Sequence, residues 1–454
     1  MLFVRDSMPH IRTTSILTAL ALCASAGAQP LTLNLEAAYA DTRAAMQAGD
    51  ADIVCLGDSL TFRPDSYLPV LRHRLQTQYG DGGIGYRSAL PGEMLTYTYS
   101  TLNDWWFGSL GPGSPPYIAL DGLWSQGNSP RFARARSVLS NFRLHVLAKS
   151  DGGLWTARDT TGQFGLALDA YAPTPEFRAF DFINPSGTPI DFSAIDPGPH
   201  WDVQDGPALR PATRGDSITI LGGVVRSGAP GVRVHRVANG GWGVQNFLRR
   251  DFTLEAQLRD INPDLYLIML GQNDIGTPVE VWRDRYIQLL NRLQTAAPEA
   301  EFILIASYNS GHPALAQMTL TLSQIAQQRG MGFFNLYAAG GSYQTYVNNG
   351  YLTDAVHFNQ AGGQYVGNLI YDALESSGRS VTAACNDIDF NNDGVFPADQ
   401  DLIDFFNVMA GGECRGSGLG APGCDSIDFN RNGVYPEEQD IIDFFNVLAG
   451  GACG

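Results

Sequence analysis

Short apolar runs alternate with segments of helical spacing over two parts of the chain. The run 52–56 is almost entirely apolar and ends at a glycine, which is typical of a strand buried on both faces of a parallel sheet. A regular alternation of strands and helices predicts an α/β domain whose parallel sheet is covered by helices on both faces. We expect strands over 52–56, 232–237, 265–270, 302–306 and 332–336, and helices over 67–79, 244–259, 279–296, 314–329 and 360–374.

A different pattern separates the two α/β parts. Residues 96–225 are rich in Gly, Pro, Trp and Phe and contain short alternating runs such as 142–147 and 217–221, which predict an inserted β-rich module. Its aromatic side chains have two interpretations: they form stacking platforms for sugar rings, or they fill the core of the module. The aromatic residues concerned are Trp105, Trp106, Tyr117, Trp124 and Trp155.

The N-terminal residues are organised like a secretory signal peptide. Basic residues occur up to Arg12, an apolar run covers 16–24, and the small residues 26–28 supply a cleavage site. We expect 1–28 to be removed and the mature protein to be secreted, whether extracellular, periplasmic or attached to the cell surface. The apolar run is too short to span a bilayer, and no later stretch reaches about 18 apolar residues, so no transmembrane segment is expected.

Charge is distributed unevenly along the 454 residues. The formal net charge is −17, and residues 385–454 contribute 11 of these negative charges. The acidic balance argues against a nucleic-acid partner, because phosphate binding depends on clustered Lys and Arg. The clustering of acids near the C-terminus instead indicates cation binding. We divide the chain into a signal peptide (1–28), an α/β domain (29–95 and 226–376), the inserted module (96–225), a linker (377–384) and a C-terminal tail (385–454).

The tail is an internal repeat with a period of 39 residues. The sequence Cys-Asn-Asp-Ile-Asp-Phe-Asn-Asn-Asp-Gly that begins at Cys385 recurs in similar form at Cys424. Cys385 and Cys414 are 29 residues apart, as are Cys424 and Cys453, which favours these two pairs, although four cysteines allow three connectivities. Disulfides agree with export to an oxidising compartment.

Each repeat opens with oxygen ligands at alternate positions, as in a calcium-binding loop. In the first copy Asp389, Asn391 and Asp393 precede Gly394, which permits the turn, and Val395 offers a backbone carbonyl. The second copy keeps this spacing with one carboxylate fewer, so we expect it to bind calcium more weakly. Its ligands are Asp428, Asn430, Asn432 and Val434.

More than one residue could supply the last calcium ligand of each loop. The twelfth position of an ordinary loop is Gln400 here, with Asp399 and Asp401 on either side, and the second copy offers Glu438 or Asp440. The predicted ligand set uses Asp401 and Asp440. Calcium is therefore expected as a structural cofactor of the tail, whereas catalysis is expected to need none.

The repeat pair resembles dockerin repeats, particularly the cysteine-bracketed kind found at the ends of secreted planctomycete proteins. The resemblance implies calcium-dependent folding and attachment to a cohesin-like or cell-surface partner. The alternative is an acidic tail stapled by disulfides without a metal. A repeat of about 35 residues has too small a hydrophobic core to fold by itself, so a disulfide or a bound metal is needed to stabilise it.

Four short blocks carry the residue types of an acyl-transfer site. Nucleophilic catalysis at a hydroxyl needs a base, an orienting carboxylate and donors for the developing oxyanion. Three of the blocks follow predicted strands, whose carboxyl ends meet at one edge of a parallel sheet. The blocks are Gly57-Asp58-Ser59-Leu60, Gly240-Gly241-Trp242-Gly243, Gly271-Gln272-Asn273-Asp274 and Asp354-Ala355-Val356-His357.

Each block supplies a residue for one role in such a site. Ser59 is the expected nucleophile, and its backbone N–H is one oxyanion donor. Gly243 and Asn273 would donate from a backbone N–H and a side-chain amide. His357 would take the proton of the hydroxyl, while Asp354, three residues earlier, would orient the imidazole.

In residue type and order the blocks resemble the SGNH or GDSL hydrolase family, over about 51–376 without the insertion. The resemblance implies a flavodoxin-like three-layer α/β/α domain, metal-free ester hydrolysis and the roles given above. The second block departs somewhat from the family pattern, so Gly240 or Gly241 is an alternative to Gly243 as donor. A β-module between the first and second blocks is similar to the layout of certain bacterial peptidoglycan and polysaccharide O-acetylesterases.

A second Gly-Asp-Ser tripeptide occurs at 215–217. It follows Pro211-Ala-Thr-Arg instead of an apolar strand, so we interpret it as a coincidence. The sequence therefore predicts a secreted serine esterase that cleaves acyl esters, O-acetyl esters foremost, on a carbohydrate or cell-wall polysaccharide. The alternatives are a lipase or thioesterase for longer acyl chains and a non-catalytic glycan-binding protein.

Overall fold

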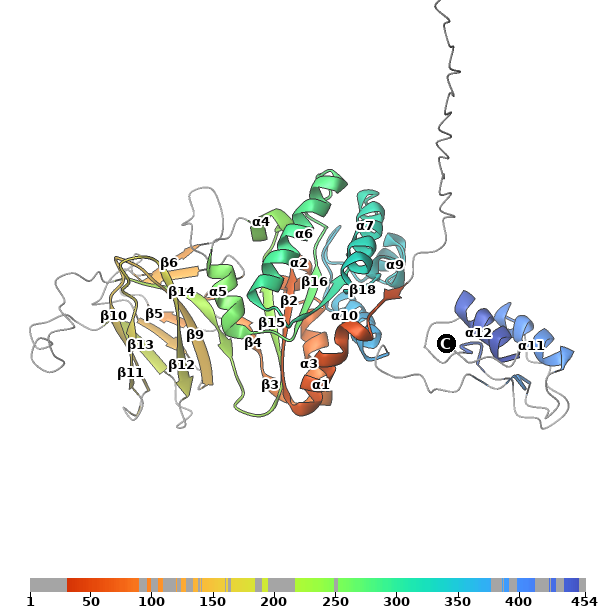
Figure 1. Cartoon of the computed structure of the whole chain (residues 1–454), viewed down its shortest axis with the longest axis horizontal. Coiled ribbons are helices and arrows are strands. Elements are labelled where there is room, and N and C mark those ends of the chain that lie inside the picture. Colours follow the sequence, from red (N-terminus) through yellow and green to blue (C-terminus); the bar gives the residue numbers. More distant parts are fainter. Residues whose placement is uncertain are drawn as a thin grey trace, which may run out of the picture.

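The structure is a computed structural model of the chain (Figure 1). The expected signal peptide and the linker 377–384 lie outside the residues that it describes. No helix in the described part of the chain has both the length and the apolarity needed to cross a membrane. The described residues are 31–89, 96–98, 105–108, 120, 124–127, 134–137, 139, 141–159, 161, 165–183, 190–194, 217–248, 252–376, 386, 388–391, 398–412, 424, 426–429 and 437–448.

A seven-stranded sheet forms the centre of the α/β domain. Its strands are β1 (Thr32–Leu33), β2 (Asp50–Gly57), β3 (Asp81–Gly83), β15 (Gly231–Ala238), β16 (Leu265–Met269), β17 (Glu301–Ile305) and β18 (Gly332–Phe334). The spatial order is β1-β18-β17-β16-β2-β15-β3, and all neighbours are parallel except β1 and β18. From β15 to β18 the strands follow the 2-1-3-4-5 order of flavodoxin-like folds.

Successive side chains of β2 enter two different cores. Ile53 and Cys55 belong to one hydrophobic cluster, Val54 and Leu56 belong to the other, and all four are fully buried. Because neighbouring side chains of a strand point to opposite faces, a strand without polar alternation requires cover on both sides. The unbroken apolar run in the sequence is explained by this double burial.

Helices supply the two covering layers (Figure 1). On one face pack α1 (Ala40–Ala48), α2 (Ser59–Phe62), α3 (Leu68–Tyr79), α8 (Leu336–Ala339), α9 (Tyr343–Asn348) and α10 (Gln360–Ser376). On the other pack α4 (Val244–Leu248), α5 (Phe252–Ile261), α6 (Val279–Ala296) and α7 (Ala314–Arg329). The mixed α/β fold agrees with the sequence-based expectation, but the single helix expected over 244–259 is represented by two helices, α4 and α5.

The inserted region consists of antiparallel strands in two sheets. One sheet has the order β11 (Gly165–Asp169), β10 (Leu154–Asp159), β13 (Ile190–Ala194), β8 (Arg134–Ser137) and β5 (Thr96–Thr98). The other has the order β12 (Glu176–Ile183), β9 (Asn141–Ala148), β14 (Ile218–Val225), β7 (Trp124–Gly127) and β6 (Trp105–Gly108), and β4 (Gly85–Arg87) also pairs with β14.

The core of this module contains Trp155, one of the aromatic residues considered as a sugar-stacking platform. Trp155 is fully buried in a cluster with residues of both sheets, including Phe142 and Phe182, whose rings stack 4.7 Å apart. Trp155 therefore fills the core and is not a platform for a sugar ring. The side chains of the other four candidates lie outside the described residues.

An ion-pair cluster joins the module to α5. Arg143 of β9 donates two hydrogen bonds to the Asp260 carboxylate, at 2.8 and 2.7 Å, and also pairs with Asp181. His145 Nε2 lies 3.0 Å from the same Asp260 carboxylate. Although burial acts to raise it, the hydrogen bonds from His145 and Arg143 hold the pKa of Asp260 well below its usual range. The bidentate geometry favours one orientation of the module on the α/β domain.

The C-terminal tail has a small aromatic core of its own. Its helices are α11 (Asp399–Met409) and α12 (Glu438–Leu448). Phe390, Phe405, Phe429 and Phe444 are all fully buried, and the rings of Phe405 and Phe444 stack 4.3 Å apart. Because these residues are related by the 39-residue period, each repeat contributes equivalent side chains. Cys424 is disulfide-bonded, and the residue bonded to it lies outside the described part of the chain.

Candidate active site

Ser59 lies directly after the central strand of the sheet. Strand β2 ends at Gly57, and Asp58 caps the single turn of α2 by accepting a hydrogen bond from Leu60 N on Oδ1 at 2.9 Å. Ser59 is the first residue of that turn and is 9% exposed. The first N–H groups of a helix have no acceptor within it, so α2 itself does not use the Ser59 N–H.

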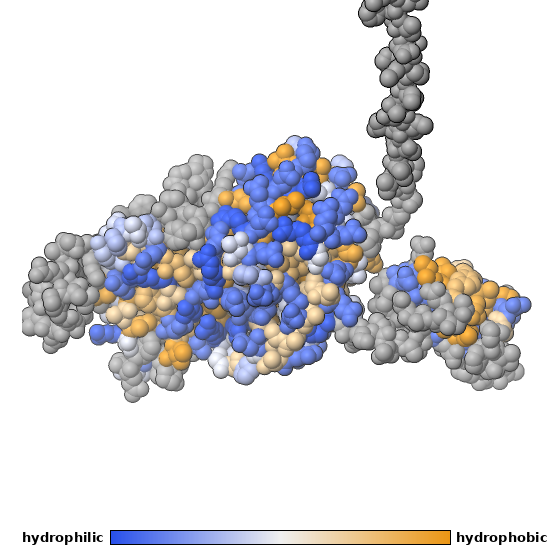
Figure 2. Space-filling model, viewed as in Figure 1, coloured by the Kyte–Doolittle hydropathy of each residue, from blue (hydrophilic) through white to orange (hydrophobic). Residues whose placement is uncertain are grey.

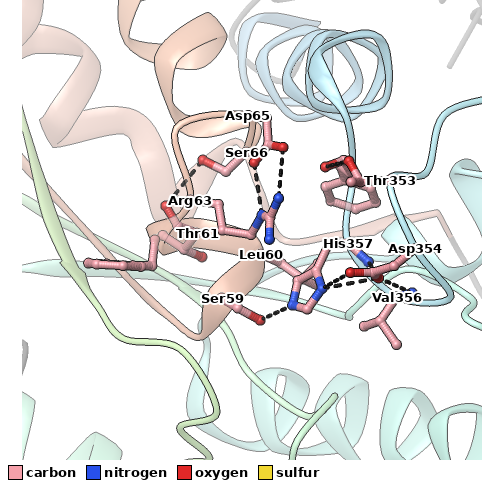
Figure 3. A network of polar contacts seen from close by, with 12 residues as sticks. Ser59, Leu60, Thr61, Arg63, Asp65, Ser66, Thr353, Asp354, Val356 and His357 are labelled. Carbon is pink, nitrogen blue, oxygen red and sulfur yellow. Dashed lines mark hydrogen bonds and ion pairs between the residues drawn. The ribbon is translucent and has the colours of Figure 1, made fainter.

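The structure brings three of the predicted residues into one hydrogen-bonded chain (Figure 3). Ser59 Oγ lies 2.9 Å from His357 Nε2 across 298 positions of sequence. On the other side of the imidazole, Nδ1 lies 2.8 Å from Asp354 Oδ2. A neutral imidazole that donates from Nδ1 to the carboxylate leaves Nε2 as an acceptor for the serine hydroxyl. This is the arrangement that base-assisted attack by a hydroxyl requires.

A closed turn orients the Asp354 carboxylate. Leu352 and Phe358 form a bridge across the turn, and Thr353 N donates to the His357 carbonyl at 2.8 Å. Within it, Asp354 Oδ1 accepts hydrogen bonds from the backbone N–H groups of His357 and Val356, both at 2.8 Å. These two bonds, with the contact to the imidazole, hold the pKa of Asp354 well below its usual range. The carboxylate is therefore ionised at any pH near neutrality.

The three expected oxyanion donors are in different situations. Asn273 is exposed, and its Nδ2 donates to the Trp242 carbonyl at 3.0 Å, which uses one of its two amide hydrogens. Gly243 N donates to Asn246 Oδ1 at 3.0 Å, so this N–H already has an acceptor inside the protein. The alternatives Gly240 and Gly241 are exposed, and a Cβ on either would meet nothing within 4 Å. Of the three glycines, Gly243 is therefore the one whose N–H would have to exchange an acceptor in order to bind an oxyanion.

A buried carboxylate explains why position 243 is a glycine. Asp274 accepts hydrogen bonds from Val244 N at the start of α4, at 3.2 Å to each oxygen. A Cβ at Gly243 would lie 2.3 Å from Asp274 Oδ1, so only glycine allows this approach. Burial raises the pKa of Asp274, and burial together with the charge of Asp274 raises the pKa of Asp58 to about 7, against hydrogen bonding that lowers it. Sequence analysis did not single out these two carboxylates as buried.

Sequence analysis also did not identify Arg63, an arginine that lies beside His357 and Asp354. Arg63 pairs with Asp65 through two hydrogen bonds, from Nε at 2.9 Å and from Nη2 at 3.0 Å. Figure 3 shows the guanidinium between the Asp65 carboxylate and the pair formed by His357 and Asp354. The pKa of Arg63 is raised, chiefly by its bond to Asp65 and also by the charge of Asp354, which agrees with this placement. Its position four residues after Ser59 is a possible sequence signal, because one helical turn brings such residues together.

The second Gly-Asp-Ser tripeptide has a different environment. Ser217 is 5% exposed and forms a bridge with Gly152. Its Oγ donates to the Asp151 carbonyl at 2.9 Å, and its N–H donates to the same oxygen at 3.0 Å. The hydroxyl is therefore used in tying the segment before β14 to the turn between β9 and β10. Residues 215 and 216 lie outside the described part of the chain.

Two other histidines also contact carboxylates but are fully buried. His235 Nε2 lies 2.7 Å from Asp52 Oδ1, while Tyr86 N donates to His235 Nδ1 at 3.0 Å. Burial lowers the pKa of His235, although Asp52 opposes this effect. His145 is equally buried beside Asp260. Neither histidine is placed to exchange protons with a substrate, because both are closed off from solvent.

The predicted calcium ligands are only partly described. The closing carboxylates hold backbone groups in both repeats: Asp401 Oδ2 accepts from Ala398 N, and Asp440 Oδ2 accepts from Glu437 N, both at 3.1 Å. Within the described residues no three His, Cys, Asp or Glu side chains gather as they would around a metal. Asp389, Asn391 and Asp428 are described, whereas Asp393, Val395, Asn430, Asn432 and Val434 lie outside the described residues.

Part of the chain matches a family model in sequence. Residues 213–365 match the GDSL-like Lipase/Acylhydrolase family. This range includes Gly243, Asn273, Asp354 and His357, and it begins just before Ser217, whereas Ser59 lies outside it. No curated protein matches the chain in sequence.

Several solved structures that match this chain are described as esterases or lipases, and the first of them shares its fold. One, described as "Peptidoglycan O-acetylesterase in action, 5 min", has a TM-score of 0.61 and 16% identity, with 77% of this chain and 100% of that chain covered. A lipase/acylhydrolase from Enterococcus faecalis has a TM-score of 0.27 and 21% identity, with 33% and 77% covered. A carbohydrate esterase family 3 protein from Talaromyces cellulolyticus has a TM-score of 0.26 and 22% identity, with 34% and 74% covered. The family match of residues 213–365, together with the fold shared with the first of these structures, supports an ester-hydrolysing enzyme.

Proposed function

We propose that the protein is a serine esterase in which Ser59, His357 and Asp354 form the catalytic triad. The observation that carries the proposal is the continuous hydrogen-bonded chain from Ser59 Oγ through the imidazole to the Asp354 carboxylate, with distances of 2.9 and 2.8 Å. Three residue types in this order and geometry supply the nucleophile, the base and the orienting charge of acyl transfer.

In the first half of the reaction, Ser59 Oγ attacks the acyl carbonyl carbon while His357 Nε2 takes the hydroxyl proton. The carbonyl oxygen becomes an oxyanion, which the Ser59 N–H, one amide hydrogen of Asn273 and a glycine N–H of the second block would stabilise. When the C–O bond to the leaving group breaks, His357 returns the proton to that oxygen. The alcohol departs and the acyl group stays on Ser59 as an ester.

In the second half, water replaces the alcohol. His357 takes a proton from the attacking water, the second tetrahedral species collapses, and the proton passes to Ser59 Oγ. The products are a carboxylic acid and the regenerated enzyme. Throughout, the ionised Asp354 stabilises the imidazolium that forms twice in each cycle.

We infer that the substrate is an O-acetylated carbohydrate or cell-wall polysaccharide. The support is the solved structure described as a peptidoglycan O-acetylesterase, which is covered over its full length. The α/β domain is about half of this chain, so a match over 77% extends into the inserted module.

The test of the esterase proposal uses p-nitrophenyl acetate and a covalent probe. Wild-type protein should hydrolyse the ester, and an alkyl phosphonate should attach to the peptide that contains Ser59, as mass spectrometry would show. The variant Ser59→Ala should lose both properties. Equal hydrolysis by wild type and this variant would defeat the proposal in favour of a non-catalytic glycan-binding protein.

Acyl-chain preference separates the proposed acetylesterase from the lipase or thioesterase alternative. We expect kcat/KM to fall from p-nitrophenyl acetate to p-nitrophenyl octanoate, and acetate to be released from O-acetylated polysaccharides. A preference for octanoate would indicate a lipase-like enzyme.

For the tail we propose a calcium-dependent attachment module on an exported protein. Asp404 of α11 is fully buried, accepts a hydrogen bond from Asn391 Nδ2 at 3.2 Å, and has no hydrogen-bond partner for Oδ1 among the described residues. A buried carboxylate oxygen without a donor costs free energy, which a bound cation would offset. Calcium, when bound, would tie the start of each loop to the helix that follows.

The tail helices also present apolar side chains to solvent, as Figure 2 shows over α11 and α12. Ile403 and Phe406 of the first repeat are 53% and 40% exposed, and Ile442 and Phe445 of the second are both 43% exposed. An apolar surface of this kind favours a protein partner, which would be cohesin-like or part of a cell surface. Added Ca²⁺ should raise the melting temperature of the tail in the full-length protein, and Asp401→Asn combined with Asp440→Asn should abolish that shift.

A further inference from the structure

A buried tyrosine joins the turn 352–358, which carries Asp354 and His357 and is called the triad turn below, to the end of a neighbouring strand. Tyr308 follows β17 and is fully buried, and its Oη donates to the Val356 carbonyl at 2.6 Å. Val356 lies between Asp354 and His357 in the turn. The hydrogen bond therefore holds the backbone of the segment that carries both the orienting carboxylate and the base.

The same tyrosine is connected to the block that carries the Asn273 amide. Gln272 Nε2 donates to the Tyr308 carbonyl at 3.0 Å, and Ser310 Oγ donates to Gln272 Oε1 at 3.0 Å. Gln272 is 8% exposed, so these bonds are largely shielded from water. Tyr308 thus contacts the block 271–274, which carries Asn273, through its backbone carbonyl, and the turn 352–358, which carries Asp354 and His357, through its side-chain hydroxyl.

Packing determines where the hydroxyl of Tyr308 lies. Its ring contacts Tyr346 at 4.7 Å and Phe358 at 4.8 Å between centroids. Phe358 bridges to Leu352 across the triad turn. Because the ring is held by these neighbours, the hydroxyl has little freedom to follow a displaced carbonyl.

We propose that Tyr308 is a positioning residue, which sets the distance between the His357–Asp354 turn and the oxyanion donor Asn273. The inference rests on the proposed esterase function and goes beyond it, because Tyr308 touches no reacting atom. The outer side of the turn is open to solvent: the Asp354 side chain is 52% exposed and the His357 side chain is 27% exposed. A partly exposed turn needs an anchor on its buried side if the base is to stay within hydrogen-bond distance of Ser59.

The chain offers a matched control in the same aromatic cluster. Tyr346 is also fully buried, but its Oη has no hydrogen-bond partner among the described residues. Replacing either tyrosine by phenylalanine keeps the ring and removes one oxygen atom. Only Tyr308→Phe removes a hydrogen bond to the triad turn.

The test compares steady-state kinetics of Tyr308→Phe and Tyr346→Phe on p-nitrophenyl acetate below the melting temperature of each. We expect Tyr308→Phe to lower kcat by about 10- to 100-fold with little change in KM, since displacement of a catalytic group by a fraction of an ångström is costly. The midpoint of the acid limb of the kcat/KM profile should move to lower pH, because a loosened turn lets Asp354 stabilise the imidazolium less well. Tyr346→Phe should match wild type in both measurements.

The outcomes distinguish this inference from the proposed function. If Tyr308→Phe equals Tyr346→Phe in kcat and in pH profile while Ser59→Ala is inactive, the esterase proposal stands and the positioning role is wrong. The role is also wrong if both phenylalanine variants lose activity equally, or if Tyr308→Phe loses activity in proportion to its loss of folded protein measured by circular dichroism. If wild type and Ser59→Ala hydrolyse the ester equally, the esterase proposal itself fails.

Discussion

The chain contains the tripeptide Gly-Asp-Ser twice, at 57–59 and at 215–217, and the two copies have different environments. Ser59 follows a strand whose residues 53–56 are fully buried, and its hydroxyl lies 2.9 Å from His357 Nε2. Ser217 precedes a strand of the inserted module, and its hydroxyl donates to the Asp151 carbonyl. What distinguishes the copies is the buried parallel strand before the first, which delivers the serine to the edge of the sheet where the other blocks also end.

The family match illustrates how little the tripeptide alone determines. The matched range 213–365 contains Ser217 and excludes Ser59 because an insertion of more than a hundred residues separates Ser59 from the remaining blocks. Within that range the only Gly-Asp-Ser serine is Ser217, whereas the serine in hydrogen-bond distance of His357 is Ser59. The tertiary contact with His357 is the stronger criterion, since proton transfer requires hydrogen-bond distance.

The sharpest test of this contrast replaces each serine in turn. Ser59→Ala should lower kcat/KM for p-nitrophenyl acetate by about 10⁴-fold or more, because loss of a triad nucleophile removes the covalent route. Ser217→Ala should leave the rate unchanged. The comparison breaks down if Ser217→Ala is the inactive variant.

Asp58, the aspartate of the first tripeptide, should make the free energy of unfolding depend on pH. Burial raises the pKa of Asp58 to about 7, so the folded state binds a proton that the unfolded state releases from about pH 4 upward. This group therefore lowers the free energy of unfolding as pH rises from 4 to 7, by about 4 kcal/mol for a shift of this size.

The variant Asp58→Asn keeps an oxygen to accept from Leu60 N and cannot ionise. We expect its melting temperature to exceed that of wild type at pH 8 and to equal it at pH 4, as measured by calorimetry. A constant difference at both pH values would show that folding does not raise the pKa of Asp58.

The glycine of the first tripeptide is required by close packing. A Cβ at Gly57 would lie 2.1 Å from Thr61 Oγ1 and 3.1 Å from the Met269 carbonyl. Thr61 is fully buried and cannot swing away, so Gly57→Ala should displace α2 and with it Ser59. We expect kcat to fall by about 10- to 100-fold. Gly276→Ala, where a Cβ meets nothing within 4 Å, is the control that should retain full activity.

The smallest effect is expected from the hydroxyl of the second tripeptide. Ser217→Ala removes the hydrogen bond to the Asp151 carbonyl and should lower the free energy of unfolding by about 1 kcal/mol. Urea denaturation of the full chain would measure it. A stability loss above about 3 kcal/mol would mean that this serine contributes more to the module than a single hydrogen bond can.

Local sequence patterns predicted most secondary structure of the α/β domain. Helix α6 begins and ends at the expected residues, Val279 and Ala296, because its apolar spacing and flanking prolines are local signals. Short elements such as α9 and β4 were not predicted, since few residues carry too little periodicity. Of the two interpretations of Trp155, the structure confirms core filling, a choice that sequence could not make because burial of a tryptophan depends on strands far away in sequence.

The sequence by itself determined which residue types exist for each catalytic role and in what order they occur, since both follow from local context along the chain. Only the tertiary structure decided that Ser59 meets His357, that Gly243 N–H already donates to Asn246, and that Tyr308 reaches the Val356 carbonyl. These contacts join residues that the sheet order 2-1-3-4-5 brings together at one edge, and strand order is set by the packing of two cores and not by any short segment.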